Sequence, residues 1–122
     1  MEKYKHEELT KEIINAAYTV HNNLGYGFLE KVYHNALIVE FRKRQIPFES
    51  EKKLTVYYLN EMIGEYFADL IVDGKVIVEV KSAENHNTGF EAQLLNYLKA
   101  AKIEVGLLIN FAKSVQVKRM VL

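Results

Sequence analysis

Apolar residues recur every three to four positions through the first part of the chain, which is the spacing of amphipathic helices. Residues 7–24 and residues 28–45 each carry such an apolar stripe. Gly25-Tyr26-Gly27 separates the two, and Pro47 follows the second at a place where helices stop. We therefore expect two successive helices, the first capped by Thr10 or by an earlier residue.

Beyond Pro47 the apolar residues alternate with polar ones or form short continuous runs, which are the patterns of β-strands. A turn is expected at Asn60-Glu61, and helical spacing returns only between Gly89 and about Ala101. The expected strands are Leu54–Leu59, Ile63–Val72, Val76–Lys81, Val105–Asn110 and, at an edge, Val115–Val121.

The predicted order of elements is therefore ααβββαββ, in a single domain formed by residues 1–122. The strand–helix–strand passage from Val76–Lys81 to Val105–Asn110 permits a parallel crossover, so the sheet should be mixed. An almost continuous apolar run marks Val105–Asn110 as a buried central strand. We expect an α/β or α+β fold in which helices flank one mixed sheet.

Asp73-Gly74 is a strong signal for a hairpin between the second and third strands. In the third strand the valines face one side of the sheet, whereas Glu79 and Lys81 face the other. Opposed residues in an antiparallel pair share a face, so Asp69 joins that side only if the loop has an odd number of residues. We predict an odd loop, such as residues 72–74 with Gly74 in the left-handed region, rather than a two-residue turn.

The composition of the chain says more about the cellular environment of the protein than about its fold. The chain is 49% hydrophobic and 26% charged, as expected of a soluble globular domain, and it has no cysteine. Its apolar runs are too short for a membrane span, and its first residues lack the apolar stretch of a signal peptide. We therefore expect a cytoplasmic protein without membrane association. The formal net charge of zero argues against a protein that holds nucleic acid by bulk charge.

Asp69, Glu79 and Lys81 together suit metal-assisted hydrolysis of phosphodiesters. Mg²⁺ prefers oxygen ligands, usually one or two carboxylates, with water and substrate at the other positions. Asp69, Glu79 and the backbone carbonyl of Val80 would hold the ion, while Lys81 would orient or acidify the attacking water. The same residues also suit a solvated sheet face, on which glutamate–lysine pairs are common.

Two pairs of polar residues on the predicted helices extend this pattern. Glu30 lies one turn from Tyr33 among apolar neighbours, where a solvated acid is not expected. Gln93 and Tyr97 are four residues apart on the later helix and share a face. Glu30 equally suits the first turn of a helix, and Gln93 and Tyr97 equally suit a hydrogen-bonded pair at the edge of the core.

Gly27-x-x-Glu30-x-x-Tyr33 matches the signature of the GxxExxY family, and the resemblance runs nearly end to end, including residues 20–27 and 91–98. That family resembles a compact branch of the PD-(D/E)xK nuclease superfamily, which has a restriction-endonuclease-like fold and, in some members, RecB-like motifs. The chain departs from the superfamily pattern at Ala68, where a proline would precede the acid.

The resemblance implies a set of site residues and an activity. It assigns Asp69 as the acid before the hairpin, Glu79-Val80-Lys81 as the ExK tripeptide, and Glu30 as a further metal ligand, direct or through water. Gln93 and Tyr97 match a Q-x-x-x-Y helix motif that lines the site and contacts phosphate or fixes the lysine. The implied activity is Mg²⁺-dependent cleavage of nucleic acid that leaves a 5′-phosphate, with Mn²⁺ as a substitute metal.

Four other residues lie close to these motifs in the sequence. His21 either reaches the site from the helix end or serves there as a cap or packing residue, and Tyr33 is expected to support the site. His86 and Asn87 follow the third strand and would form a loop at the mouth of the site, where nucleic acid would contact the protein.

Three functions fit these residues. The first is a Mg²⁺- or Mn²⁺-dependent nuclease, with DNA favoured over RNA. The second is a non-catalytic module that keeps the nuclease fold and binds nucleic acid or a protein partner that supplies targeting. The third is a structural protein with a charged hydrogen-bonded network, and the full set of ligand types beside Lys81 argues against it. A specific DNA interface buries about 1,000 Å² or more, and a homodimer would enlarge the small surface of this domain.

Overall fold

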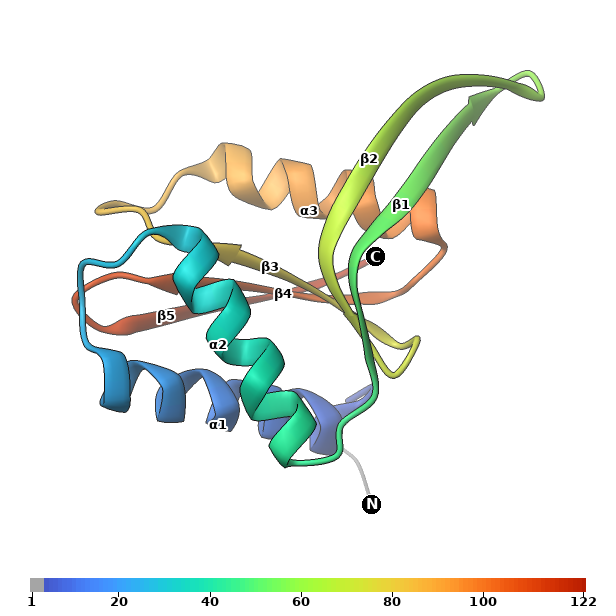
Figure 1. Cartoon of the computed structure of the whole chain (residues 1–122). Coiled ribbons are helices and arrows are strands. Elements are labelled where there is room, and N and C mark those ends of the chain that lie inside the picture. Colours follow the sequence, from blue (N-terminus) through green and yellow to red (C-terminus); the bar gives the residue numbers. More distant parts are fainter. Residues whose placement is uncertain (1–3) are drawn as a thin grey trace.

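A computed structural model describes residues 4–122, in which three helices and five strands follow one another in the predicted order (Figure 1). The helices are α1 (Glu7–Leu24), α2 (Glu30–Lys43) and α3 (Thr88–Ala101). The strands are β1 (Phe48–Tyr58), β2 (Glu61–Val72), β3 (Val76–Lys81), β4 (Val105–Phe111) and β5 (Val115–Val121). None of the described helices is long and apolar enough to cross a membrane.

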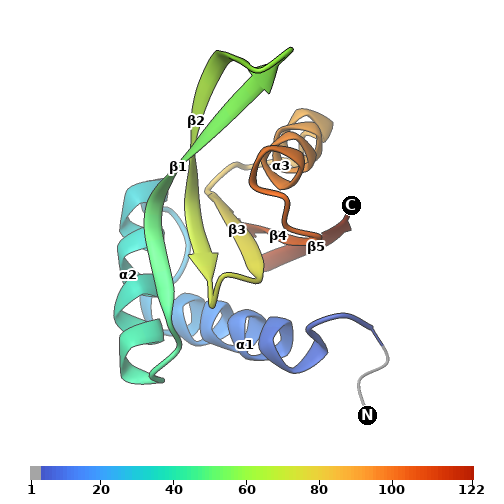
Figure 2. The same ribbon diagram turned by 90° about the vertical axis from the view of Figure 1, so that its right-hand side faces the viewer.

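The five strands form one sheet in the order β1-β2-β3-β4-β5, and among these described strands only β3 and β4 pair in parallel. Figure 2 shows α1 and α2 against one face of the sheet and α3 against the other. The valines of β3 belong to the core under α1 and α2, whereas Ile77 belongs to the core under α3. All seven residues of β4 are buried. The predicted mixed sheet flanked by helices is therefore confirmed, as is its buried central strand.

The loop between β2 and β3 has three residues, because Val72 pairs with Val76. Its first two residues, Asp73 and Gly74, have φ angles of 52° and 64°, which lie in the left-handed region that glycine and aspartate tolerate best. The predicted odd loop is confirmed, although it spans residues 73–75 rather than 72–74. Continuing this register places Asp69 opposite Glu79 on one face of the hairpin.

Three predicted boundaries near the amino-terminal half are wrong. Strand β1 begins at Phe48 instead of Leu54, because a polar and exposed edge strand pairs through its backbone and needs no apolar alternation. The turn lies at Leu59-Asn60, both with positive φ, rather than at Asn60-Glu61. Helix α2 is shorter than residues 28–45, and its N-cap, Leu29, is 79% exposed.

The cap predicted for α1 is also wrong in part. Thr10 is buried inside the helix, where its hydroxyl donates to the carbonyl of Glu7 over 3.0 Å. The N-cap is His6, an earlier residue, as the second of the two predicted choices allowed.

Strands β1 and β2 continue past the sheet as a two-stranded arm, which we define as residues 52–68 (Figure 1). Pairing between β2 and β3 ends at Leu70 and Val78, so the arm is paired only within itself. Large exposed apolar side chains concentrate on it, namely Tyr57, Tyr58, Leu59, Met62, Ile63, Tyr66 and Phe67. The divergence of β2 from β3 at the base of the arm opens the sheet at Asp69.

Candidate active site

The strands β2 and β3 separate at Asp69 and Glu79. There each carboxylate accepts a hydrogen bond from a backbone amide of the other strand, in place of a backbone carbonyl. The Asp69 amide donates to Glu79 Oε1 over 3.1 Å, and the Val80 amide donates to Asp69 Oδ2 over 2.8 Å. Such charge-assisted bonds satisfy the backbone where the ladder stops. The two acids are thus held together at the split in the sheet, with their side chains crossing between the strands.

Burial makes this pair electrostatically unusual. Glu79 is only 3% exposed. Its pKa rises from 4.5 to about 9, first because burial penalises the charged form and then because of the charge of Asp69. The Asp69 amide and the Lys81 charge act in the opposite direction. The Glu79 carboxyl therefore keeps its proton near neutral pH unless a cation balances its charge.

Lys81 lies at the end of β3, two residues beyond Glu79 and on the same face of the strand. Its Nζ donates to Gln93 Oε1 over 3.1 Å and lies 4.9 Å from the centre of the Phe90 ring. Helix α3 therefore fixes the lysine from above the sheet through both contacts. The Gln93 contact is one of the two roles that the sequence predicted for this residue.

Tyr97 lies one turn after Gln93 on α3 and is buried against the same face of the sheet. Burial raises the pKa of its hydroxyl, and the charges of Glu79 and Asp69 raise it further. Its ring lies 5.4 Å from the ring of Tyr66 at the base of the arm. Tyr97 thus lines the site beside the acids, in its neutral form.

Glu30 begins α2 and approaches the site from its open edge. The protein around its carboxyl raises its pKa by desolvation, Lys81 opposes this shift, and Asp69 adds to it. Glu30 nevertheless keeps an exposed surface. Its apolar neighbours in the sequence are not all core residues, because Leu29 is 79% and Val32 37% exposed. The structure therefore places Glu30 at the rim of the site and not in an apolar pocket.

The loop before Glu30 explains the other residues of the Gly27-x-x-Glu30-x-x-Tyr33 signature. Gly25 and Gly27 have φ angles of 75° and 111°, which favour glycine. The Tyr33 hydroxyl donates to the Gly25 carbonyl over 2.6 Å and accepts from the Phe28 amide over 3.2 Å. Tyr33 is fully buried and stacked on a phenylalanine of β4. It supports the site by holding this loop, and its burial rules out contact with substrate.

The sequence analysis missed His34, which lies one turn after Glu30 and is buried. Its Nε2 lies 3.1 Å from Ser50 Oγ of β1. Burial lowers its pKa, against an opposing effect of the Asp69 charge, so the imidazole is neutral at pH 7. The i,i+4 spacing from Glu30 was the available signal, because it places both side chains on one face of α2.

His21 and the two residues expected at the mouth, His86 and Asn87, all have structural partners. His21 Nε2 lies 2.9 Å from the carbonyl of Ala112, and its ring stacks near Phe111, so it packs the helix end against β4. Asn87 caps α3, with its side chain accepting from the Gly89 amide over 2.7 Å. His86 pairs with Glu91 over 2.6 Å. The structure thus gives His21 the packing role of its two predicted roles.

The donor set fits a hard divalent cation of the Mg²⁺ type. Within residues 4–122, no three His, Asp or Glu side chains converge closely enough to ligate one ion by themselves. Mg²⁺ is usually held by only one or two carboxylates and keeps several waters, and Asp69 and Glu79 supply that pair. The pKa of the buried Glu79 carboxyl rises to about 9 despite the charge of Lys81, and a bound cation would add further positive charge to balance it.

The sequence profile of the PD-(D/E)XK nuclease superfamily matches residues 7–120. Among solved structures, the one described as "Crystal structure of SSO0001" superposes with a TM-score of 0.62 at 15% identity. The match covers 96% of this chain but only 57% of that protein, and at this identity it shows a shared fold alone. No curated protein matches the sequence.

The profile match includes every residue of the candidate site, from Glu30 to Tyr97. The mixed sheet flanked by helices and the order of its elements agree with the shared fold. With nearly its whole length matched, the chain belongs to the PD-(D/E)XK nuclease superfamily.

Proposed function

We propose that this protein is a Mg²⁺- or Mn²⁺-dependent nuclease of the GxxExxY branch that hydrolyses phosphodiester bonds, with DNA favoured over RNA. One observation carries the proposal. The carboxylates of Asp69 and Glu79 accept hydrogen bonds from each other's strand at the split between β2 and β3. Lys81 follows on the same face of β3. This combination of two acids and a fixed lysine supports metal-assisted attack on a phosphodiester better than it supports a solvated surface, because Glu79 is buried.

Each residue of the site would have a role that follows from its charge and position. Asp69, Glu79 and the Val80 carbonyl would hold the metal, with Glu30 as a further ligand at the rim. When bound, the metal would supply an activated water and withdraw charge from the phosphate. Lys81, held by Gln93, would orient that water and stabilise the negative charge that grows on the phosphate in the transition state. Tyr97 would line the site with a neutral hydroxyl.

Cleavage of labelled single- and double-stranded DNA and RNA with Mg²⁺ or Mn²⁺ tests the proposal. We expect Lys81→Ala and Asp69→Ala to lose about 100-fold or more of the cleavage rate. Lys75→Ala is the matched control, since this lysine lies in the loop at the opposite end of the same hairpin and is exposed. Cutting that survives both site variants would refute the proposal. Binding without any cutting would favour the non-catalytic module that the zero net charge also allows.

A further inference from the structure

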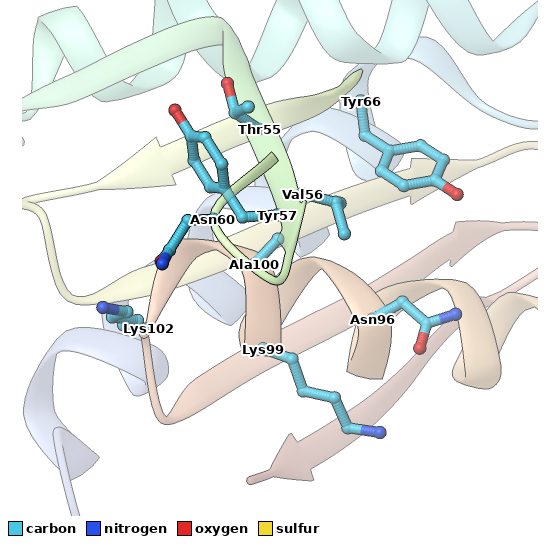
Figure 3. A pocket seen from close by; sticks show the side chains of 9 residues that line it. All are labelled: Thr55, Val56, Tyr57, Asn60, Tyr66, Asn96, Lys99, Ala100 and Lys102. Carbon is cyan, nitrogen blue, oxygen red and sulfur yellow. The ribbon is translucent and has the colours of Figure 1, made fainter. Parts of the chain in front are cut away.

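A groove lies between the arm and the second half of α3 (Figure 3). Its volume is about 730 Å³, within the usual range of ligand sites. Side chains from both walls line it, namely Tyr57, Asn60 and Tyr66 from the arm and Asn96, Lys99 and Lys102 from α3 and its C-cap.

The lining suits a single strand of nucleic acid. Tyr57 and Tyr66 are 66% and 46% exposed, so their rings are available to stack on bases. Lys99 and Lys102 bring positive charge for phosphates, and none of the described residues that line the groove is acidic. Figure 3 shows the labelled side chains of the arm on one side and Lys99 and Asn96 of α3 on the other. The groove therefore combines aromatic faces with charge of one sign.

The groove lies next to the candidate active site. Tyr66 belongs to its wall, and its ring lies 5.4 Å from that of Tyr97, which lines the site beside the acids. Along α3, Ala100 in the groove follows Gln93 by two turns, about 10 Å along the helix axis. A strand whose phosphate reaches Lys81 would thus have its neighbouring nucleotides beside the groove.

We propose that the groove is a nucleotide subsite that holds an unpaired stretch of the substrate strand, so that the protein acts on single-stranded nucleic acid. Action on that strand rests on the proposed nuclease function, whereas binding in the groove does not need cleavage. Duplex bases are stacked on each other and expose only their edges in the grooves, so a duplex does not offer base faces to the tyrosines. The polar and cationic lining favours this ligand over a second copy of the chain.

Binding measured without metal separates the subsite from catalysis. Fluorescence anisotropy in EDTA would use labelled single-stranded DNA, single-stranded RNA and the same DNA sequence as a duplex. Tyr57→Ala should weaken single-strand binding about 5- to 100-fold, the range for loss of one stacked base. Replacing Lys99 and Lys102 with glutamine should also lower the slope of log affinity against log salt, by about 0.7 per phosphate contact.

Matched controls come from α1, on the opposite face of the sheet. Tyr18→Ala and Lys11→Gln change exposed residues of the same types and should leave binding unaltered. All five substituted side chains, in the groove and in the controls, are exposed, and circular dichroism melting would check that each variant folds.

Each outcome decides the inference. Loss of single-strand binding in the groove variants, with controls unchanged, supports the subsite even if the wild type cuts nothing, and then only the proposed nuclease function fails. Unchanged binding in the groove variants overturns the subsite even if cleavage depends on Lys81. The subsite is also overturned if the groove variants lose as much affinity for the duplex as for the single strand. A third outcome that overturns it is a groove variant that changes the molar mass of the protein in light scattering but not its binding of nucleic acid.

Discussion

Replacing Glu79 with glutamine should stabilise the metal-free protein at alkaline pH. The folded protein raises the pKa of this carboxyl from 4.5 to about 9, so between these values it binds more protons than the unfolded chain. The stability from the protonated group is therefore complete below about pH 4.5 and falls as the pH rises towards 9. Glutamine keeps an oxygen for the Asp69 amide and a donor for the Asp69 carboxylate, and it does not titrate.

The size of this stability difference follows from the single proton that Glu79 binds in the folded protein. Each pKa unit corresponds to about 1.4 kcal/mol, so the free energy of unfolding of the wild type should fall by about 4 kcal/mol more than that of Glu79→Gln between pH 5 and pH 8. A domain of this size has a total stability of about 5–15 kcal/mol, so the effect is large. The charge of Asp69 contributes to the raised pKa of Glu79, so the fall in stability depends on both residues.

Urea unfolding followed by circular dichroism in EDTA at pH 5, 6, 7 and 8 measures this difference. Comparing variant with wild type cancels the contributions of groups common to both, including His34. Glu84→Gln in the exposed loop after β3 is the control, because it makes the same substitution at an exposed carboxyl. Parallel pH profiles for the wild type and Glu79→Gln would refute the raised pKa of the buried Glu79 carboxyl.

Two further predictions concern the cation and the packing of the sheet. Mn²⁺ at a hundred times its dissociation constant should raise the free energy of unfolding of the wild type by about 2.7 kcal/mol, and thermal melting should show no such gain in Asp69→Asn. An unshifted wild-type melting temperature would contradict the metal site. Gly106→Ala should destabilise the fold by about 1–3 kcal/mol, because its new Cβ would lie 2.9 Å from Leu94 Cδ1, whereas Gly64→Ala, with nothing within 4 Å, should be neutral or slightly stabilising in urea unfolding. Equal effects of the two alanines would show that the close contact between β4 and α3 is not the cause.

The sequence by itself determined the features that depend on local periodicity. Helix α1 has its predicted bounds, because its apolar stripe and the glycine that ends it are adjacent in the sequence. The odd number of residues in the hairpin loop followed from the alternating valines and from the need to bring Asp69 onto the face of Glu79 and Lys81. The family signature and the order of elements also lie in the sequence, and they identified the superfamily that the profile match shows.

Only the tertiary structure decided how distant segments meet. It showed that Glu79 is buried against Asp69, that Tyr33 locks the loop before Glu30, and that His34 is buried within reach of the Asp69 charge. It also showed that β1 and β2 leave the sheet as an arm and enclose a groove with α3. Burial and charge coupling depend on neighbours far apart in the chain, so periodicity carries no information about them.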